Sequence, residues 1–263
     1  MSYLYETHLH TSYSSACANS RGSEYIRYYK DMGYSGIIVT DHFYNGNTAI
    51  SQSLPWNEWV KQYCRGYEEA RNEGEKQNFD VLFGWEETFD SCDDYLVYGL
   101  DKAWLLEHPE VRTWTRGEQY RAVKEAGGCV VQAHPFRQHY YIKKVILSSG
   151  CVDAIEAANA GNSEQSYDAL ALRYANKLGL PVIASTDIHD ARQFNGGWIF
   201  GTYFKYRLNT IADFVRAIRN NDISGFNTSD GRCDFQGDEH VKVPVEVRDR
   251  NDKIMNIDWK YLI

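Results

Sequence analysis

Short apolar runs alternate along the chain with longer segments whose apolar residues recur at helical spacing. Apolar runs of this length, bounded by turn residues, predict buried strands, and the amphipathic segments between them predict helices. The expected strands cover residues 3–6, 36–40, 79–85, 95–100, 129–132, 152–157 and 181–184. The expected helices cover residues 23–32, 56–76, 115–127, 163–178 and 210–220. This alternation is typical of a parallel sheet covered by helices.

Local signals support several of these boundaries. Ser23 is a favourable cap for the first helix, and Gly33 and Gly179 are placed to end two helices. Thr115 and Glu118 form a capping box at the start of another helix. Because the strand–helix units follow one another without a GxGxxG motif after the first strand, we expect a closed α/β barrel rather than a dinucleotide-binding sheet.

The length of the chain fits one domain over residues 1–263, because α/β barrels of about 250 residues commonly form a single domain. From residue 228 onward the chain turns polar, and only residues 241–247 alternate in the manner of a strand. We therefore expect residues 228–263 to form a peripheral C-terminal segment.

Composition and charge narrow the possible functions. No apolar run approaches the roughly 20 residues that span a bilayer, so we expect a soluble, cytoplasmic protein without a membrane partner. The six cysteines lack CxxC spacing and are expected to be reduced, mostly structural thiols. The net charge of -8 argues against an extended nucleic-acid surface. It leaves a small anionic substrate possible, since bound cations would dominate the local field.

Potential metal ligands follow several of the expected strands. His8 and His10 lie two residues apart after the first strand, and Asp187 and His189 do so after the last. Because residues i and i+2 of a strand project from the same face, each pair can be aimed at one point. The remaining candidates follow the strands in between: Asp41, His42, Glu86 and His134. Since the carboxyl ends of barrel strands meet at one mouth, the sequence predicts one polynuclear metal site there.

Each motif taken singly has an ordinary structural explanation. Asp41-His42 equally fits a turn, and His134 fits a hydrogen-bonded loop histidine. Glu86 fits a water-facing carboxylate, with Glu87 beside it as an equal candidate. The joint arrangement favours the metal site, because five of the eight histidines follow expected strands and because imidazole and carboxylate are the ligands of hydrolytic centres.

Five motifs occur in a fixed order along the chain: His8-x-His10-Thr11, Thr40-Asp41-His42, Glu86, His134-Pro135 and Asp187-x-His189. This set resembles the polymerase and histidinol phosphatase (PHP) domain family over about residues 1 to 205. The resemblance implies a distorted (β/α)7 TIM-like barrel. It also implies a trinuclear Zn, Mn or Fe centre that hydrolyses phosphate esters.

The resemblance further implies a distribution of ligands over three ions: His8, His10 and Asp187 on the first, Glu86 as the bridge to a second, His134 on that second ion, and His42 with His189 on a third. Ser15 stands where family members often carry His or Asp, so the third ion would be weakly held or bound through water. Asp94 stands where many members carry His, and a carboxylate would still ligate a hard cation and shift preference toward Mn or Fe. We therefore expect two or three divalent ions.

Asp41 and Ser15 are assigned supporting positions behind the ligands. The side chains of Asp41 and His42 diverge in an extended strand end, so Asp41 is expected to orient a ligand imidazole rather than to bind an ion.

The expected chemistry is metal-assisted hydrolysis. Ions held close together polarise phosphoryl oxygens, and a bridging water whose pKa falls from 15.7 toward roughly 7 supplies the attacking hydroxide. Glu86 and Asp187 are the expected catalytic carboxylates. Arg137 is the expected phosphate clamp, although it equally fits a surface loop arginine, and Arg21 and Arg192 are weaker candidates.

Aromatic residues bear less on the function. Trp56, Trp59, Trp85 and Trp198 could wall a pocket that stacks a base or an imidazole ring, but aromatic stripes are more often core. We therefore expect these tryptophans to belong to the core.

The resulting functional prediction is a metal-dependent phosphoesterase that cleaves a small phosphorylated metabolite, such as histidinol phosphate or a nucleotide. A phosphodiesterase or exonuclease acting on short oligonucleotides is the alternative within the same class. A non-catalytic metal-binding module and a metal-dependent hydrolase of C–N bonds are further alternatives. The sequence leaves the native metal and the oligomeric state open.

Overall fold

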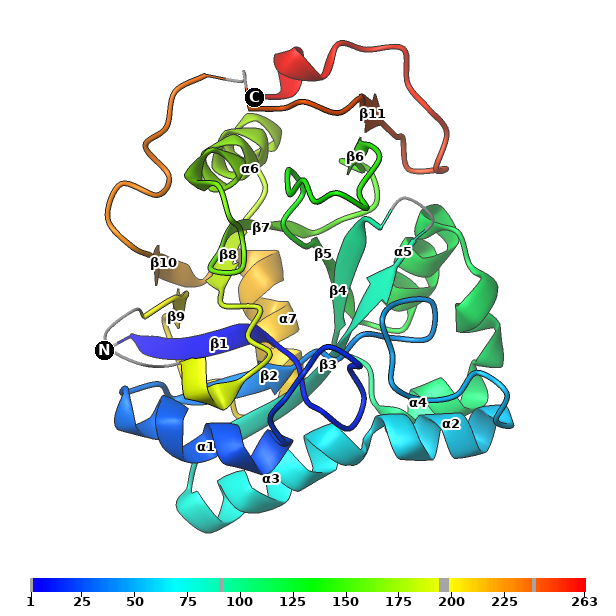
Figure 1. Ribbon diagram of the computed structural model, residues 1–263, viewed down its shortest axis with the longest axis vertical. Coiled ribbons are helices and arrows are strands. Elements are labelled where there is room, and N and C mark those ends of the chain that lie inside the picture. The colour runs from blue at the N-terminus through cyan, green and yellow to red at the C-terminus, as the bar shows by residue number, and fades with distance from the viewer. Residues whose placement is uncertain (1, 90–91, 194–198, 238–239) are drawn as a thin grey trace.

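A curved sheet forms the centre of the protein in the computed structural model of Figure 1, which describes residues 2–89, 92–193, 199–237 and 240–263. Its strands are β1 (Tyr3–Leu9), β2 (Gly36–Val39), β3 (Asp80–Thr88), β4 (Asp94–Tyr98), β5 (Cys129–Gln132), β7 (Ala154–Asn159), β8 (Val182–Ser185), β9 (Gly201–Phe204) and β10 (Ile223–Asn227). The helices are α1 (Gly22–Asp31), α2 (Trp56–Tyr63), α3 (Arg65–Gln77), α4 (Lys102–Glu107), α5 (Arg116–Glu125), α6 (Gln165–Leu178) and α7 (Ile211–Asn220).

The strand order is β10-β9-β1-β2-β3-β4-β5-β7-β8, and the strands from β1 to β8 curl toward each other. Neighbours β1, β2 and β3 are parallel, as are β5, β7 and β8, whereas β4 runs antiparallel to both β3 and β5. The ends meet where Asp187 N–H donates to the His8 carbonyl at 2.9 Å and His10 N–H donates to the Ile188 carbonyl at 3.0 Å. The expected distorted α/β barrel is confirmed as a nearly closed barrel.

Apolar faces of the helices cover this barrel. Helix α1 buries Tyr25, Ile26 and Tyr29 against Ile37 of β2 and Val81 of β3. The apolar face of α7 packs against side chains that point into the barrel from several strands. Helix α7 thereby closes the end of the barrel opposite the candidate ligands. The polar side chains that end the strands therefore have one open side, at the mouth.

Several expected boundaries differ from the structure. Residues 56–76, expected as one helix, form two helices, α2 and α3, which meet at Cys64. Gly66, in the first turn of α3, lies so close to Thr11 that a Cβ atom there would overlap the Thr11 hydroxyl. Helix α1 begins at Gly22 and is not capped by Ser23, whose hydroxyl donates instead to Glu69 at 2.7 Å.

Three strands of the structure were not expected from the sequence. β9 and β10 extend the sheet beside β1, and β6 (Val145–Leu147) pairs in parallel with β11 (Val245–Val247) in a separate ribbon. β10 is half-exposed and contains Gly225, so its sequence lacks the apolar run used to find the other strands. The antiparallel direction of β4 was also not expected, since hydrophobic periodicity does not encode strand direction.

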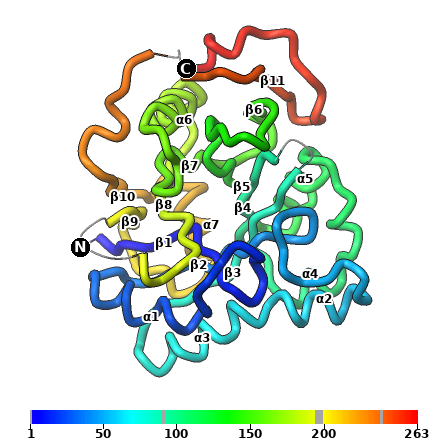
Figure 2. Tube along the Cα trace, viewed as in Figure 1, coloured from blue at the N-terminus to red at the C-terminus, as the bar shows by residue number. Residues whose placement is uncertain are grey.

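Residues 228–237 and 240–263 run along the outside of α6 and β6, as Figures 1 and 2 show. The segment is attached through β11 and through Arg232, which is 5% exposed and forms an ion pair with Asp168 of α6. Arg232 also donates to the carbonyls of Asn159 and Asn162 at 2.7 and 2.8 Å, and so stabilises the loop that follows β7. In the described ranges, no helix has the length and apolar character required to cross a bilayer.

Candidate metal centre

The motifs His8-x-His10 and Asp187-x-His189 lie side by side because the barrel closes between β1 and the loop after β8. Backbone hydrogen bonds join the end of β1 to the loop after β8, with Leu9 and Ile188 forming a parallel bridge. His8 Nε2 and His10 Nε2 lie 3.0 Å apart, and His10 Nε2 lies 3.0 Å from Asp187 Oδ1. Residues almost 180 positions apart in sequence therefore share one site.

Imidazole and carboxylate groups at this mouth form overlapping sets whose ligand atoms lie within 4.8 Å of one another: His8 with His10 and Asp187, Glu86 with Asp94 and His134, His10 with His42 and His189, and His8 with His134 and Glu156. The structure thus brings together every residue that the sequence offered as a candidate ligand. It adds Glu156, which the sequence analysis did not single out.

Glu86 is the centre of the arrangement. It lies within β3 rather than after its end, and it is 1% exposed. Its Oε1 atom is 3.1 Å from His8 Nε2 and 3.4 Å from His134 Nε2, whereas its Oε2 atom is 2.5 Å from His42 Nδ1. Each carboxylate oxygen therefore faces different imidazoles, so Glu86 would be able to contribute one oxygen to each of two ions.

The imidazoles of His8, His10 and His189 are oriented by hydrogen bonds on their Nδ1 atoms. His8 Nδ1 pairs with Glu156 at 2.9 Å, His10 Nδ1 with the Ser15 hydroxyl at 3.1 Å, and His189 Nδ1 with the Asp187 carbonyl at 2.8 Å. With the proton on Nδ1, each ring leaves Nε2 unprotonated, as a metal ligand requires.

Asp41 and Ser15 stand behind the ligands. The Asp41 carboxylate accepts from Thr11 N–H at 2.5 Å, from the Thr11 hydroxyl at 2.7 Å and from the Ser15 hydroxyl at 2.7 Å. Ser15 in turn accepts from His42 N–H at 3.0 Å. This network orients His10 through Ser15, and it leaves the Ser15 oxygen committed to protein groups.

Glu156 is the supporting residue that sequence reasoning missed. It is buried in β7, where its Oε1 atom accepts from His8 and from the Ser185 hydroxyl, and its Oε2 atom accepts from His134 N–H at 2.9 Å. The signal was a single carboxylate inside the apolar run Ala154-Ile155-Glu156-Ala157-Ala158, because a buried charge needs partners.

Asp94 opens β4 and faces His134 from the neighbouring strand. His134 Nε2 lies 3.8 Å from Asp94 Oδ2. His134 and Asp187 both have positive φ angles, 27° and 56°, in a region that residues with side chains rarely adopt. Backbone strain of this kind concentrates at functional sites. Its occurrence at two candidate ligands fits a metal centre that requires their side chains to point toward it.

The electrostatics of the cluster suit divalent cations. Burial would raise the pKa of Glu86, but the imidazoles of His8 and His42 hold it well below its usual range. Burial and the neighbouring Glu86 carboxylate raise the pKa of Asp94 well above its usual range. Two acidic groups that face each other in this way are stabilised by a cation between them. Glu86 Oε2 and His42 Nδ1 are buried and, apart from their 2.5 Å contact with each other, have no hydrogen-bond partner among the described residues, so the donor set fits metal ions.

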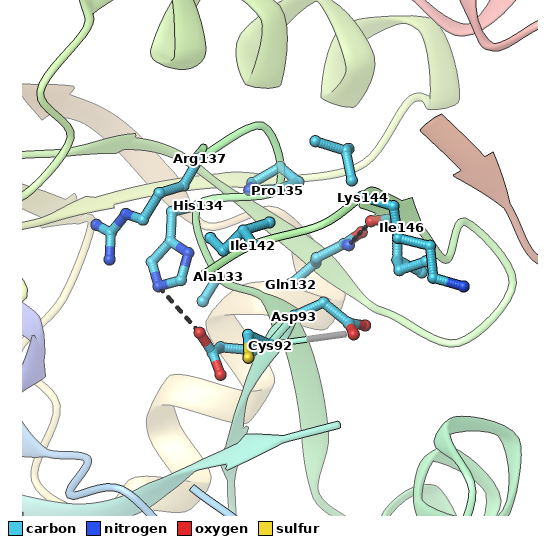
Figure 3. A pocket seen from close by; sticks show the side chains of 12 residues that line it. Cys92, Asp93, Gln132, Ala133, His134, Pro135, Arg137, Ile142, Lys144 and Ile146 are labelled. Carbon is cyan, nitrogen blue, oxygen red and sulfur yellow. Dashed lines mark hydrogen bonds and ion pairs between the residues drawn. The ribbon is translucent and has the colours of Figure 1, made fainter. Parts of the chain in front are cut away.

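Arg137 lies beside His134 at the site, where its side chain is visible in Figure 3. Its Nη1 donates to Asp187 Oδ2 at 2.7 Å, its Nη2 to Asn159 at 2.7 Å, and its Nε to Asn162 at 2.8 Å. The guanidinium therefore holds Asp187 in place. It is itself held by Asn159 and Asn162, which lie in the loop that Arg232 stabilises.

The two weaker arginine candidates lie away from the ligands. The Arg21 guanidinium packs over the ring of Tyr13, and the 74% exposed Arg192 side chain pairs with Asp190. Neither residue lines the pocket at the mouth.

A pocket of about 600 Å³ opens over the cluster. Its lining includes His42, Glu86, Asp94, His134, Asp187, His189 and Arg137, together with Cys17. Burial would raise the pKa of the Cys17 thiol, but side-chain hydrogen bonds to His189 and His42 lower it to about 6. Cys17 was grouped with the structural thiols in the sequence analysis, and its place in this pocket was not foreseen.

Trp56, Trp59 and Trp85 are not part of the pocket wall. Trp59 and Trp85 are fully buried in the largest apolar cluster, and Trp56 stacks on Trp59 with ring centroids 5.3 Å apart. The expectation that they belong to the core is confirmed for these residues, while Trp198 lies outside the described residues.

No protein-family model and no curated protein matches the chain. Solved structures do match its fold. One is a two-domain protein from Bacteroides vulgatus that contains a predicted PHP-like metal-dependent phosphoesterase, with 16% identity, a TM-score of 0.63, and coverage of 85% of this chain and 64% of that one. The present chain thus spans less than two thirds of that protein.

Two further structures extend the comparison. A protein from Bifidobacterium adolescentis described as a metal-dependent phosphoesterase matches with 16% identity and a TM-score of 0.51 over 73% of this chain and 90% of that one. The lesion-specific endonuclease PfuEndoQ from Pyrococcus furiosus matches with 13% identity and a TM-score of 0.55 over 87% of this chain and 58% of that one. The chain therefore has the fold of the PHP-like metal-dependent phosphoesterases.

Proposed function

We propose that this chain is a metal-dependent phosphoesterase that hydrolyses a small phosphomonoester of the histidinol phosphate or nucleotide type. The observation that carries the proposal is the convergence of imidazoles and carboxylates from β1, β3, β5 and β8 into overlapping ligand sets at the barrel mouth. In barrels of this kind, reactive groups gather at the carboxyl ends of the strands.

The residues of the chain have distinct tasks in this proposal. Glu86 would bridge two ions, Asp187 would ligate one of them, and Arg137 would fix the Asp187 carboxylate through its 2.7 Å hydrogen bond. Bound divalent ions supply Lewis acidity toward phosphoryl oxygens and lower the pKa of water. With its Nη1 already donating to Asp187, Arg137 serves phosphate recognition as a nearby positive charge more than as a free bidentate clamp.

Two or three ions of the Zn, Mn or Fe type match the donor set, because neutral imidazole and carboxylate suit all three metals. The pocket volume of about 600 Å³ fits a metabolite-sized ligand, within the roughly 300–1,000 Å³ range of small-molecule sites. The free thiol state of all six cysteines supports the cytoplasmic location that is part of this proposal.

The test is a phosphate-release screen over phosphorylated metabolites, using protein reconstituted separately with each of the three metals. We expect metal-dependent turnover of monoesters by the native chain and by His240→Ala, whose imidazole lies outside the centre. Turnover should be lost in His10→Ala. Bound metal without hydrolysis of any ester would contradict the proposal and favour a non-catalytic metal-binding module.

Phosphodiester cleavage is the second candidate, favoured by the fold that the chain shares with a lesion-specific endonuclease. The net charge of -8 speaks against a long nucleic-acid substrate, because binding a phosphate backbone needs clustered basic residues. Comparing para-nitrophenyl phosphate with its bis ester separates the two candidates. Faster turnover of the bis ester would favour the phosphodiesterase.

A further inference from the structure

The loop after β1 carries a thiol into the mouth of the barrel. Cys17 lies in this loop between two backbone contacts to the elements that bear His42 and His189. Ala16 N–H donates to the Asn47 carbonyl at 2.9 Å, in the loop that follows His42, and Asn19 N–H donates to the carbonyl of His189 itself at 2.7 Å. The backbone on both sides of Cys17 is therefore fixed to the neighbours of its side chain.

The Cys17 thiol reaches both imidazoles. Its thiol interacts with His42 and with His189, and all three side chains line the same pocket. His42 and His189 also form a ligand set with the fully buried His10. A sulfur, two imidazoles and a third imidazole behind them thus surround one position.

Independent observations point to a cation at this position. Glu86 is 99% buried, and its Oε2 atom faces His42 Nδ1 at 2.5 Å and His10 Nε2 at 3.6 Å. Apart from this 2.5 Å contact with each other, neither Glu86 Oε2 nor His42 Nδ1 has a hydrogen-bond partner among the described residues. Buried polar atoms that converge but lack further hydrogen-bond partners are expected where an ion completes them.

Ser15, the residue that the sequence placed at the third ion, is committed elsewhere. Its hydroxyl donates to Asp41 at 2.7 Å and accepts from His42 N–H at 3.0 Å and from His10 Nδ1 at 3.1 Å. Its single proton and both lone pairs are therefore used. Cys17, two residues further along this loop, interacts with both His42 and His189 and lines the pocket with them, so it is the candidate for the remaining ligand.

We infer that Cys17 is a ligand of the third ion, completing with His42 and His189 a sulfur-containing position beside the oxygen-rich position of Glu86, Asp94 and His134. This inference rests on the proposed polynuclear centre. Thiolate with imidazole suits Zn²⁺, whereas carboxylates also accept harder ions such as Mn²⁺. The two positions would therefore differ in metal preference, with zinc selected at the position that contains Cys17.

Cobalt(II) substitution of the full chain tests the assignment, because a thiolate bound to Co²⁺ gives a charge-transfer absorption that nitrogen and oxygen ligands do not give. We expect the absorption in the native chain, its loss in Cys17→Ser, and its retention in Cys92→Ser, which removes another thiol of the same pocket. Loss of this ligand should lower the affinity for the third ion by more than the roughly 10- to 100-fold typical of residues that only orient a ligand. An absorption that is absent from the fully loaded native chain, or that persists in Cys17→Ser, would overturn the inference.

Alkylation of the native chain provides a second measurement that needs no variant. Cys17 is exposed, so iodoacetamide should modify it in metal-free protein, and stoichiometric zinc should protect it, as read by peptide mass spectrometry. Equal modification with and without zinc would refute the assignment. Both readouts are independent of turnover, so a chain that shows the cobalt absorption but hydrolyses no ester would contradict the proposed function and leave the thiol ligand established.

Discussion

Replacing Glu156 by glutamine tests whether the supporting carboxylate sets the protonation of the metal ligands. Glu156 is fully buried and accepts on both oxygens. Oε1 receives His8 Nδ1–H at 2.9 Å and the Ser185 hydroxyl, and Oε2 receives His134 N–H and the Asn159 side-chain amide, each at 2.9 Å. A carboxylate satisfies all of these donors, because it has no proton of its own.

Glutamine has only one accepting oxygen, so its NH2 group must face one of the two donor pairs. If the NH2 group faces His134 N–H and the Asn159 amide, the backbone N–H of His134 is left buried and unpaired, because a backbone N–H cannot become an acceptor. If it faces His8, the imidazole must accept on Nδ1 and carry its proton on Nε2. Nε2 is the atom that lies 3.1 Å from Glu86 and faces the centre. Either orientation impairs the site.

The expected loss of zinc affinity for Glu156→Gln is about 10- to 100-fold, the usual effect of removing a partner behind a metal-binding imidazole. An unpaired buried donor should also cost about 1–3 kcal/mol of stability. Competition titration with a zinc-binding dye measures the first effect, and denaturant unfolding of the metal-free protein measures the second.

Glu87→Gln is the matched control for this experiment. Glu87 is the neighbouring buried carboxyl, and burial raises its pKa well above the usual range, which favours the neutral form whose shape glutamine reproduces. We expect zinc affinity within about threefold of the native chain, a difference of less than 1 kcal/mol. If Glu156→Gln also bound zinc this tightly while folded, the argument that Glu156 fixes the tautomer of His8 would be refuted.

Further predictions follow from the same contacts. His10→Ala or Asp187→Ala should reduce the metal content and abolish turnover, as elemental analysis and phosphate release would show. Arg137→Ala should lower both metal content and kcat, because Asp187 loses its 2.7 Å partner, whereas a rise in KM alone would indicate a pure phosphate clamp. Removing the ions with a chelator should lower Tm by roughly 5–10 °C per ion. An ion present at 100-fold excess over its Kd stabilises the folded state by about 2.7 kcal/mol, and this stabilisation is lost with the ion. Arg232→Ala leaves Asp168 buried without its cation and should cost about 3–5 kcal/mol, measured by denaturant unfolding.

The barrel could be predicted from the sequence because its strands are buried on both faces and so appear as uninterrupted apolar runs. Gly36–Val39 and Cys129–Gln132 are fully buried, and their runs mark them clearly. The strands that the sequence analysis missed, such as Ile223–Asn227, are half-exposed and contain polar residues and glycine. Exposure weakens the hydrophobic signal in the sequence, so strands at the edge of the sheet were lost while those around the site were found.

The predicted ligands share a property that makes them visible in a sequence: each lies in or directly after a buried strand. Cys17 does not, because it lies in a loop whose path depends on hydrogen bonds to Asn47 and His189. No periodicity encodes such contacts. The sequence therefore placed Ser15 near the third ion, two residues from the thiol that the fold brings to the pocket.

Glu156 and Glu6 show that a further signal was present but unused. Each is a single carboxylate within an apolar strand, and both are fully buried. Burying a charge is unfavourable unless donors surround it, and those donors must come from the adjacent strands. Glu6 accepts from His8 N–H and from the hydroxyl and N–H groups of Thr186, while Glu156 accepts from His8 Nδ1–H. A carboxylate that interrupts an apolar strand beside a histidine motif therefore indicates which groups orient the ligands, and in this chain both carboxylates contact the first of them.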